Sequence, residues 1–571
     1  MNERPRSEVE RIKAESRLLR GTIARSLADP VTGALAPDDA QLIKFHGSYQ
    51  QDDRDLRAER RQRLLEPAYG FMVRVRIPGG LCTSRQWIDL DALAERHANG
   101  TLRLTTRQTI QFHGILKRDL KPSIAAIDAT LLSTLAACGD VNRNVMVATL
   151  PVRRALHEDV LGIAREISDH LLPHTRAYHE IWLDEVRLTP EAPEEEPIYG
   201  SNYLPRKFKI GFAVPPDNDI DVFTQDLGYI AIVEDGRLAG FDVTVGGGMG
   251  MSFGEPATYP RLGDVLGFCT PAQALAVATA VVTAQRDHGD RSDRKHARLK
   301  YTLDDLGLAA FRADVEARQG FAFAPARPYS FTHTGDRFGW FEDDRGRWHF
   351  GLFVEAGRIA DRGAWRARTG LRAIARAVAP EFRLTANQNL LVAGIRAEDR
   401  ARVAALLADY GIDGTAERPA RRLALACVGL PTCGLAMADS ERYLAAFMTR
   451  FEALLARHGL RDEEITLRMT GCPNGCARPY VAEIALVGKA PGRYTLYLGG
   501  AFDGTRLNAQ YRENLDEAGL LAALDPLLAD YAAARRPGER LGDFLVRRGI
   551  VPAIASGQAF AAATRRPGAG A

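Results

Sequence analysis

The chain contains no long apolar run and no leader-like beginning. Its longest uncharged stretch, residues 265–285, is interrupted by Pro271 and carries several polar side chains. It is therefore too short and too polar to span a bilayer, and instead predicts a buried helix that begins near the proline. The first residues mix both charges densely without an apolar core, which excludes a secretory signal and an acid-poor transit peptide. We expect a cytoplasmic protein.

The chain also lacks a strong excess of charge of either sign. Its net charge is only +3 over 571 residues, so no global field favours nucleic acid or a membrane surface as a partner. A chain of this length should form about three or four domains. Any anion site must therefore come from a local concentration of arginine and lysine.

Three segments show such a concentration, and each alternates polar and apolar residues with the period of a β-strand. Their polar faces carry Arg103, Arg107, Gln111 and His113 in residues 103–114, Arg74 and Arg76 in 71–80, and Lys207 and Lys209 in 203–214. A solvated edge strand shows the same alternation, and it is the simpler interpretation of any one segment. Together with Arg143, however, the three indicate one large anionic ligand with many carboxylates or phosphates.

An internal repeat predicts the architecture. Residues 103–115, RLTTRQTIQFHGI, recur 280 positions later as RLTANQNLLVAGI with six identities, and residues 71–80 have a counterpart at the same offset. This pattern predicts two copies of one α+β module around a pseudo-two-fold axis. The positions that differ include Arg107, Gln111 and His113, which become Asn387, Leu391 and Ala393. Only the first copy is therefore expected to keep an anion-binding surface.

Cysteine is scarce, yet four of the seven cysteines form two close pairs, Cys427-x5-Cys433 and Cys472-x3-Cys476. This spacing fits an iron–sulfur cluster better than a zinc site, where CxxC pairs are usual. Four buried structural cysteines remain an alternative, and a disulfide pair is less favoured. The isolated Cys82, Cys138 and Cys269 are expected to be small buried residues.

A glycine-rich segment, residues 243–251, superficially resembles a dinucleotide-binding loop. Met251 stands where the third glycine of GxGxxG should fall, and the chain has no P-loop. We expect these glycines to allow a close backbone approach to a cofactor.

Together, the Cx5C pair, TGCPNGC, LTTRQTIQFHG, VNRNV and LPRKFK resemble the sirohaem- and 4Fe-4S-containing sulfite and nitrite reductases over nearly the whole chain. Residues 45–60 and 487–500 look most like the haemoprotein subunits of the NADPH-dependent branch. The resemblance implies an α+β fold of duplicated pseudo-two-fold modules. Mixed sheets with flanking helices would form three domains around the cofactors.

The resemblance also implies roles for individual residues. The 4Fe-4S cluster would be held by Cys427, Cys433, Cys472 and Cys476, the last of which would also be the axial ligand of the sirohaem iron. The residues lining sirohaem would be Arg103, Arg107, Gln111, His113, Arg206, Arg298 and Asn474. The substrate pocket would consist of Arg74, Arg143, Lys207 and Lys209, with arginines as anchors and one of the lysines as proton donor. Without the resemblance, the stretch around Arg298 fits an exposed charged helix equally well.

The implied activity is the six-electron reduction of sulfite to sulfide, in sulfate assimilation and cysteine biosynthesis. Electrons would come from NADPH through a flavoprotein (alpha) subunit carrying FAD and FMN. A ferredoxin-dependent sulfite or nitrite reductase is the alternative within the family. A non-enzymatic sirohaem or iron–sulfur carrier is disfavoured, because a carrier needs no pocket of four cations.

The expected domain organisation has four parts. Residues 1–68 form an arm that folds on a partner or wraps its own domain. Residues 69–137 and 337–412 form the duplicated ferredoxin-like repeat domain. Residues 138–336 form an α/β domain for sirohaem and substrate, and residues 413–571 form the domain of the cluster and sirohaem.

Overall fold

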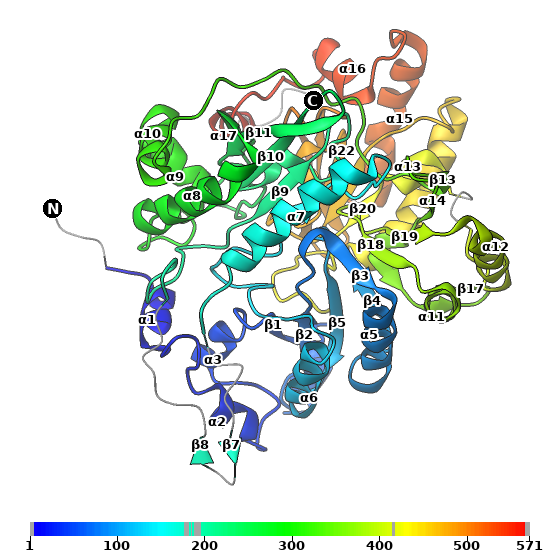
Figure 1. Cartoon of the computed structure of the whole chain (residues 1–571). Helices are drawn as coiled ribbons and strands as arrows, with labels where there is room; N and C mark the ends of the chain where they lie inside the picture. The colour runs from blue at the N-terminus through cyan, green and yellow to red at the C-terminus, as the bar shows by residue number, and fades with distance from the viewer. Residues whose placement is uncertain (1–4, 176–181, 184–185, 188–195, 414–416, 566–571) are drawn as a thin grey trace.

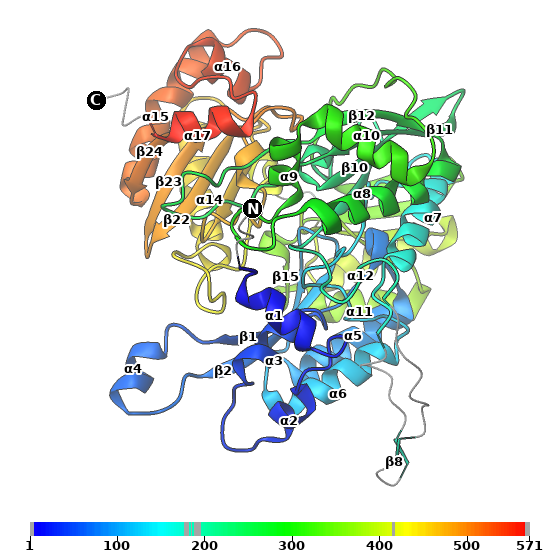
Figure 2. The ribbon, with the colours of Figure 1, turned by 90° about the vertical axis from the view of Figure 1, so that its left-hand side faces the viewer.

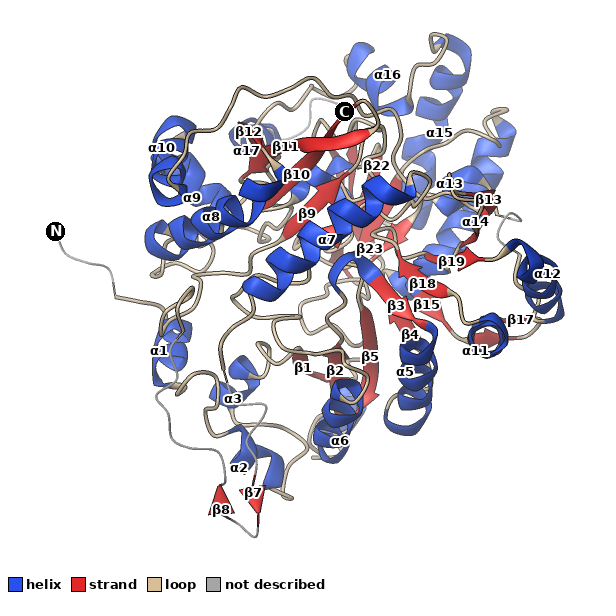
Figure 3. Cartoon of the chain, viewed as in Figure 1, coloured by secondary structure: helices blue, strands red, loops and turns tan. Residues whose placement is uncertain are grey.

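The computed structural model describes residues 5–175, 182–183, 186–187, 196–413 and 417–565 (Figure 1). The described residues form four five-stranded sheets and two short two-stranded ones. Strands gather toward the middle of the molecule and helices lie around them (Figure 3). No helix of the described part is long and apolar enough to cross a membrane. The sheets and the helices around them confirm the α+β fold class that was expected from the sequence.

The two repeat copies form matching sheets. The first has the order β1 (Ser48–Asp52), β2 (Tyr69–Arg74), β5 (Ile110–Ile115), β4 (Leu102–Leu104), β15 (Arg358–Ile359). The second has the order β13 (Gly339–Glu342), β14 (Trp348–Leu352), β19 (Leu390–Ile395), β18 (Glu381–Leu384), β3 (Leu81–Thr83). The last strand of each sheet comes from the other copy, since β15 pairs with β4 and β3 pairs with β18. The predicted pseudo-two-fold duplication is confirmed, and it includes an exchange of edge strands.

Helices of the two copies share one core. The first copy supplies α5 (Ser84–His97) and α6 (Lys117–Asp128), and the second supplies α11 (Ala367–Val378) and α12 (Arg400–Asp409). Between them, Trp87 of α5 stacks on Phe382 of β18 with ring centroids 4.6 Å apart. Both rings are buried in a cluster that contains apolar residues of both copies. The copies are therefore held together by packing as well as by strand exchange.

The middle of the chain forms a mixed sheet with the order β12 (Asp264–Cys269), β11 (Arg237–Val245), β10 (Leu227–Glu234), β9 (Ile210–Ala213), β6 (Met146–Val147). Its helices are α7 (Arg154–His170), α8 (Ala274–His288), α9 (Leu299–Leu306) and α10 (Leu308–Gln319). The helix expected near Pro271 is present as a 3-10 turn at Pro271–Gln273 that leads into α8. The apolar residues before Pro271 form β12 instead, because an apolar run alone does not distinguish strand from helix.

The C-terminal sheet has the order β20 (Leu425–Ala426), β21 (Leu467–Thr470), β22 (Ile484–Ala490), β23 (Arg493–Leu498), β24 (Ala509–Leu515). The helices of this part are α13 (Pro419–Arg422), α14 (Glu441–Arg457), α15 (Glu517–Ala534), α16 (Leu541–Arg547) and α17 (Gly557–Arg565). Strands β20 and β21 are parallel neighbours. Their carboxyl ends therefore open at the same edge of the sheet, where both cysteine loops begin.

The N-terminal segment packs on its own chain. It contains α1 (Glu8–Glu15), α2 (Ile23–Ala28), α3 (Pro37–Leu42), β1 and α4 (Arg57–Gln62). Lys13 of α1 is buried, pairs with Glu10 and donates to the carbonyl of Leu204 at 2.7 Å. The connection between β1 and β2 carries α4 away from the body of the molecule (Figure 2). At the base of this connection, Arg54 donates to the carbonyl of Cys433 at 3.2 Å.

The remaining elements are short hairpins. β7 (Trp182–Leu183) pairs with β8 (Val186–Arg187), and β16 (Asp361–Arg362) pairs with β17 (Trp365–Arg366).

All three strand predictions were wrong in extent. In 71–80, β2 ends at Arg74, and Pro78–Gly80 form a 3-10 turn. Residues 103–114 are not one strand but a hairpin, in which β4 and β5 pair antiparallel around a turn with Gln108 at φ +52°. The Thr105 hydroxyl accepts from the amides of Arg107 and Thr109 within this turn, and Gln108 donates to the carbonyl of Val147 in another segment. These polar side chains mimic strand alternation in the sequence. In 203–214 only Ile210–Ala213 is a strand. Lys207 and Lys209 precede it in an irregular segment, yet both still flank the buried Phe208.

We predict that Trp87→Ala lowers the free energy of unfolding by about 3–5 kcal/mol, because it leaves a cavity in the core that joins the copies. Val31→Ala, at a side chain that is 88% exposed, should change it by less than about 0.5 kcal/mol. Urea denaturation followed by circular dichroism measures both. Equal, small effects would show that the copies do not depend on this contact.

Candidate cofactor and anion site

The four paired cysteines come from two loops at one sheet edge. Cys427 follows β20, and Cys472 and Cys476 follow β21. The thiol of Cys472 lies close enough to the thiols of Cys427, Cys433 and Cys476 for their charges to raise its pKa. The amide of Gly471 donates to Cys427 Sγ at 3.1 Å, and Asn474 Nδ2 lies 3.6 Å from Cys472 Sγ. The two pairs therefore converge, and N–H groups already face two of the sulfurs.

Burial and mutual proximity keep the thiols of Cys427, Cys433 and Cys472 protonated when no metal is present. They raise the pKa of Cys427 and of Cys472 to about 12, and they raise the pKa of Cys433 as well. Thiolates at this place are therefore stable only when they bind metal cations. No group of three or more Cys, His, Asp or Glu side chains in the described part is arranged to hold a single metal ion. An iron–sulfur cluster, whose irons are separated by inorganic sulfides, spreads its thiolates wider than one ion does. The isolated Cys82, Cys138 and Cys269 are buried, as expected.

The glycine-rich segment packs against the second cysteine loop. The amide of Met251 donates to the carbonyl of Pro473 at 3.2 Å. A Cβ at Gly475, which has φ +64°, would lie 2.9 Å from the carbonyl oxygen of Met249. Strand β11 leads into this segment and not into a helix, so no helix N-terminus is there to meet a pyrophosphate. The glycines therefore serve the close approach of two backbones next to the cysteines.

Three arginines lie close together beside the turn of the first hairpin. Arg107 donates to Gln225 Oε1 at 2.8 Å and to the carbonyl of Asn144 at 2.5 Å, while its Nε is buried without a partner. Arg74 donates to Cys138 Sγ at 3.0 Å, and its Nε is also buried without a partner. Burial and the nearby Arg143 lower the pKa of Arg107 to about 9. The fold thus brings like charges together without neutralising them.

Lys207 and Lys209 extend this cluster toward Cys476. No described residue accepts a hydrogen bond from either ammonium group. Burial, Arg206 and Arg143 lower the pKa of Lys207 to about 7, and Cys476 acts in the opposite direction. Burial and Arg107 also lower the pKa of Lys209 well below its ordinary value.

A cavity of about 140 Å³ is lined by several other residues that were predicted to bind sirohaem or sulfite. It is lined by Arg206, Lys207, Arg298 and Asn474, together with Met251 and Tyr301. Arg298 forms a bidentate pair with the buried Asp226, both distances being 2.9 Å. Arg298 is therefore a buried residue that directly precedes α9, and it is not part of an exposed charged helix.

Arg103, Gln111 and His113 form a separate network. Arg103 Nε donates to Glu441 Oε2 at 2.7 Å, and Arg103 also lies 3.4 Å from Gln111 Oε1. Arg358 donates to the other oxygen of Glu441 at 2.6 Å and lies 3.5 Å from His113 Nδ1. Burial and these arginines hold the pKa of His113 well below its usual range. This network lies beside Cys427, since Arg103 also donates to the carbonyl of Ala426 at 3.0 Å.

Several residues of the site were missed from the sequence. The buried Lys300 donates to the carbonyl of Gly250 at 2.6 Å, and its neighbour Arg298 could have pointed to it. Asp226 and Glu441 neutralise predicted arginines, and Arg358 shares the carboxylate of Glu441 with Arg103. All three are distant in sequence from the predicted residues and belong to no motif. Arg478 was also missed, although it lies two residues after Cys476.

Arg478 joins the two repeat turns to the cysteine loop. It donates to the carbonyl of Thr106 at 3.0 Å and to Asn387 Oδ1 at 3.1 Å. The hydroxyl of Thr106 in turn donates to the carbonyl of Cys476 at 2.9 Å. The turn of the first copy therefore meets the cysteine loop directly, and Asn387 of the second copy meets Arg478.

These residues fit a polyanionic cofactor next to an iron–sulfur cluster. Two arginine Nε atoms are buried without partners, and two lysines have no acceptor among the described residues. An unpaired buried charge costs several kcal/mol, so an anion bound here would stabilise the protein. Cys476 is close enough to Lys207 for its charge to act on the lysine, so the cluster of cations lies beside the cysteine loop.

We predict that Lys207→Met raises the stability of protein purified without a bound anion, by about 1–3 kcal/mol at pH 6. The pKa of about 7 means that the native state resists the charged lysine. The cost is fully present below about pH 7 and disappears as the pH rises toward the ordinary lysine value of 10.5. Urea denaturation at pH 6 and pH 9 measures this, with the exposed Lys121→Met as control. A gain that does not shrink at pH 9 would contradict the lowered pKa.

Two family models of nitrite and sulfite reductases match parts of the chain. The family model of the nitrite and sulphite reductase 4Fe-4S domain matches residues 163–323, and that of the nitrite/sulfite reductase ferredoxin-like half domain matches residues 64–130 and 342–410. The NirA protein of Mycobacterium tuberculosis shares the fold, with a TM-score of 0.76 at 23% identity over 95% of each chain.

Curated relatives are much closer in sequence. The sulfite reductase (NADPH) hemoprotein beta-component of Myxococcus xanthus is 59% identical over 97% of this chain and 98% of its own. The protein of the same name from Geobacillus kaustophilus is 56% identical over the same shares. At this identity over nearly its whole length, the chain belongs to the family of the sulfite reductase (NADPH) hemoprotein beta-components, within the nitrite and sulfite reductases.

Proposed function

We propose that this protein reduces sulfite to sulfide at a sirohaem coupled to a 4Fe-4S cluster, in assimilatory sulfate reduction. The observation that carries the proposal is the cluster of incompletely neutralised cations beside four convergent cysteines. The names of the relatives support the same activity and favour NADPH over ferredoxin as the source of electrons.

The residues that would hold the cofactors follow from their positions. Cys427, Cys433, Cys472 and Cys476 would hold the cluster, and Cys476, which is the most exposed of the four, would also bind the sirohaem iron. The eight carboxylates of sirohaem need many donors. Those available are Arg107, Arg206, Arg298 and Asn474 next to Cys476, with Arg103, Gln111 and His113 on the side of Cys427. When bound, the coupled pair supplies single electrons at an iron centre that accepts sulfite.

The substrate pocket would be formed by Arg74, Arg143, Lys207 and Lys209. Sulfite carries negative charge, and the two arginines stay protonated at any working pH, so they would anchor its oxygens. Each of the three oxygens leaves as water and takes up two protons, which requires six protons along with six electrons. A lysine with a pKa of about 7 can donate a proton and be recharged from solvent. Lys207 is therefore the favoured donor, with Lys209 beside it.

The electrons would come from a separate subunit. No dinucleotide-binding loop is recognisable in the sequence, and the glycine-rich segment packs on the cysteine loop instead. The relatives are named beta-components, which supports a partner alpha subunit. We propose that this partner is a flavoprotein whose FAD and FMN carry electrons from NADPH, and that both subunits work in the cytoplasm.

We predict that Lys207→Met lowers kcat by about 10²–10⁴-fold, the usual cost of losing a positioned proton donor. Arg74→Ala should mainly raise KM, because it removes charge and hydrogen bonds from the bound anion. Steady-state kinetics with reduced methyl viologen measures both and bypasses the flavoprotein. Lys121→Met and Arg85→Ala, on exposed helix faces, are the matched controls. A lysine variant that changes only KM, with an arginine variant that abolishes kcat at unchanged binding, would reverse the two roles.

We also predict an asymmetry between the repeat copies. Arg107→Ala should reduce sirohaem content severalfold, measured by visible absorption and iron analysis, because it removes a buried cation that has an unpartnered Nε. Asn387→Ala, the same position of the second copy, should leave the content close to wild type. Equal loss in both variants would mean that the second copy also binds the cofactor. A protein with zinc and no haem absorption would contradict the proposed function itself.

A further inference from the structure

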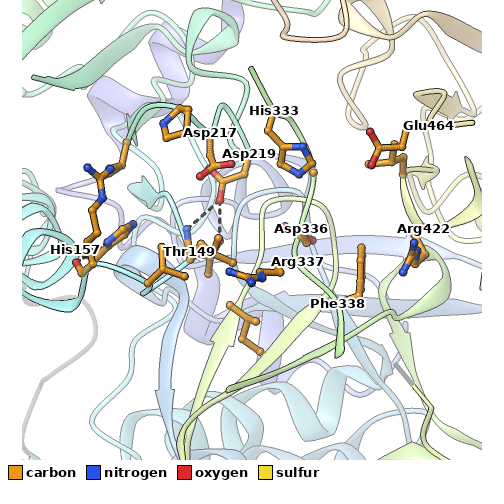
Figure 4. Close-up of a pocket in the computed structure, with 18 of the residues that line it drawn as sticks. Thr149, His157, Asp217, Asp219, His333, Asp336, Arg337, Phe338, Arg422 and Glu464 are labelled. Carbon is orange, nitrogen blue, oxygen red and sulfur yellow. Dashed lines mark hydrogen bonds between the residues drawn. The ribbon is translucent and has the colours of Figure 1, made fainter. Parts of the chain in front are cut away.

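A second cavity, of about 520 Å³, lies on the side of the second repeat copy (Figure 4). Leu391, the counterpart of Gln111, is one of its lining residues. Asn387, the counterpart of Arg107, donates to Asp336 on its wall at 3.1 Å. None of the residues assigned above to the cluster, sirohaem or sulfite lines this cavity. It is a separate cavity whose charge pattern differs from that of the cation cluster.

Two aspartates, Asp217 and Asp219, line this cavity together with Arg153 and His333. Asp219 is 4% exposed, and its Oδ2 accepts from the amide of Thr149 at 3.0 Å. Its Oδ1 is buried without a hydrogen-bond partner. Asp217 lies beside it, and both are labelled on the same side of the cavity in Figure 4. A buried carboxylate oxygen without a donor is costly, so this part of the cavity lacks a group that can donate hydrogen bonds.

The raised pKa of Asp219 also indicates that this carboxyl lacks a hydrogen-bond donor or a cation. Burial, followed by the nearby Asp336 and Asp217, raises the pKa of Asp219 to about 8. A buried carboxyl without a cation keeps its proton in this way. The ammonium group of a ligand could take the place of that proton. A single metal ion fits less well, because no described group of three or more ligand side chains is arranged to hold one.

Two arginines, Arg337 and Arg422, also line the cavity. Arg337 lies over the ring of Phe341 at 4.8 Å, and Arg422 lies over that of Phe338 at 5.2 Å. Neither forms an ion pair with any described residue. Glu464, which also lines the cavity, is already paired with Arg540 at 3.0 Å. The lining thus includes a carboxylate oxygen without a donor, on Asp219, and two arginines without a carboxylate partner among the described residues.

We propose that this cavity binds a small zwitterion of the amino-acid type. Its ammonium group lies on Asp219 and Asp217, and its carboxylate lies on Arg422 and Arg337. A ligand with both charges satisfies both pairs of residues, whereas a simple amine or a simple acid satisfies only one. Side chains such as Leu391, Leu423 and Phe338 supply an apolar surface between the two ends.

Isothermal titration calorimetry on the full-length holoprotein tests the proposal. The probes are the ω-amino acids from glycine to 6-aminohexanoate, with pentylamine and pentanoate as ligands of a single charge. We expect at least one amino acid to bind about ten-fold more tightly than either single-charge ligand. Asp219→Asn keeps an oxygen for Thr149 and should weaken this binding about ten-fold or more. Asp530→Asn, on α15 and outside the cavity, makes the same chemical change and should have no effect.

Two results would overturn the proposal. One is that no amino acid of the series binds with Kd below roughly 10 mM. The other is that pentylamine or pentanoate binds as tightly as the best amino acid. If Asp219→Asn does not fold, Arg422→Gln decides the matter, because it removes the carboxylate site at a partly exposed residue. Unchanged affinity in that variant contradicts the proposal, and about ten-fold weaker binding supports it.

Discussion

The carboxylate of Asp221 is the contact on which the arrangement of the domains depends. It comes from the middle domain and binds Arg468 of β21 at 2.6 Å and Arg478 of the cysteine loop. Arg478 then reaches the carbonyls of Thr106 and Ala386, which belong to the turns of the two repeat copies. All these groups are buried, and removing one partner of such a pair costs about 3–5 kcal/mol. A single acid therefore fixes the cysteine loop relative to both copies.

This arrangement explains why so much positive charge can lie near the cysteines. Asp221, Asp226, Asp140 and Glu441 neutralise arginines of the site. Burial alone would raise the pKa of Asp140 and of Glu441, but the neighbouring arginines lower both to about 2. Arg74, Arg107, Lys207 and Lys209 receive no such carboxylate partner within ion-pair distance. Among the described residues, the cations proposed to bind sulfite thus lack carboxylate partners, whereas Arg103 and Arg298, proposed to line sirohaem, have them. The distinction is one of local charge balance and not of residue type.

Much of the fold could be predicted because it is written in local patterns. The repeat at a constant offset predicted the duplication, and the alternation around Phe208 placed Lys207 and Lys209 on one side even though the segment is not a strand. The exchange of β3 and β15 could not be predicted, since it depends on pairing between residues that are far apart in sequence. The carboxylates that pair with the arginines could not be predicted from the sequence either. Glu441 and Asp226 meet Arg103 and Arg298 only in three dimensions, and a lone carboxylate in a sequence has no signature. The proposed domain boundaries and site roles stay predictions.

The exchanged edge strands also constrain how the chain can be made. Strand β4 has its open edge covered by β15, which is synthesised more than 250 residues later. Until then, the first copy presents unpaired N–H and C=O groups at a sheet edge, and such edges promote association with other chains. Domains of a nascent chain generally fold in order from the N-terminus, yet this first copy cannot close its sheet alone. Productive folding during translation thus depends on protecting that edge until the second copy emerges.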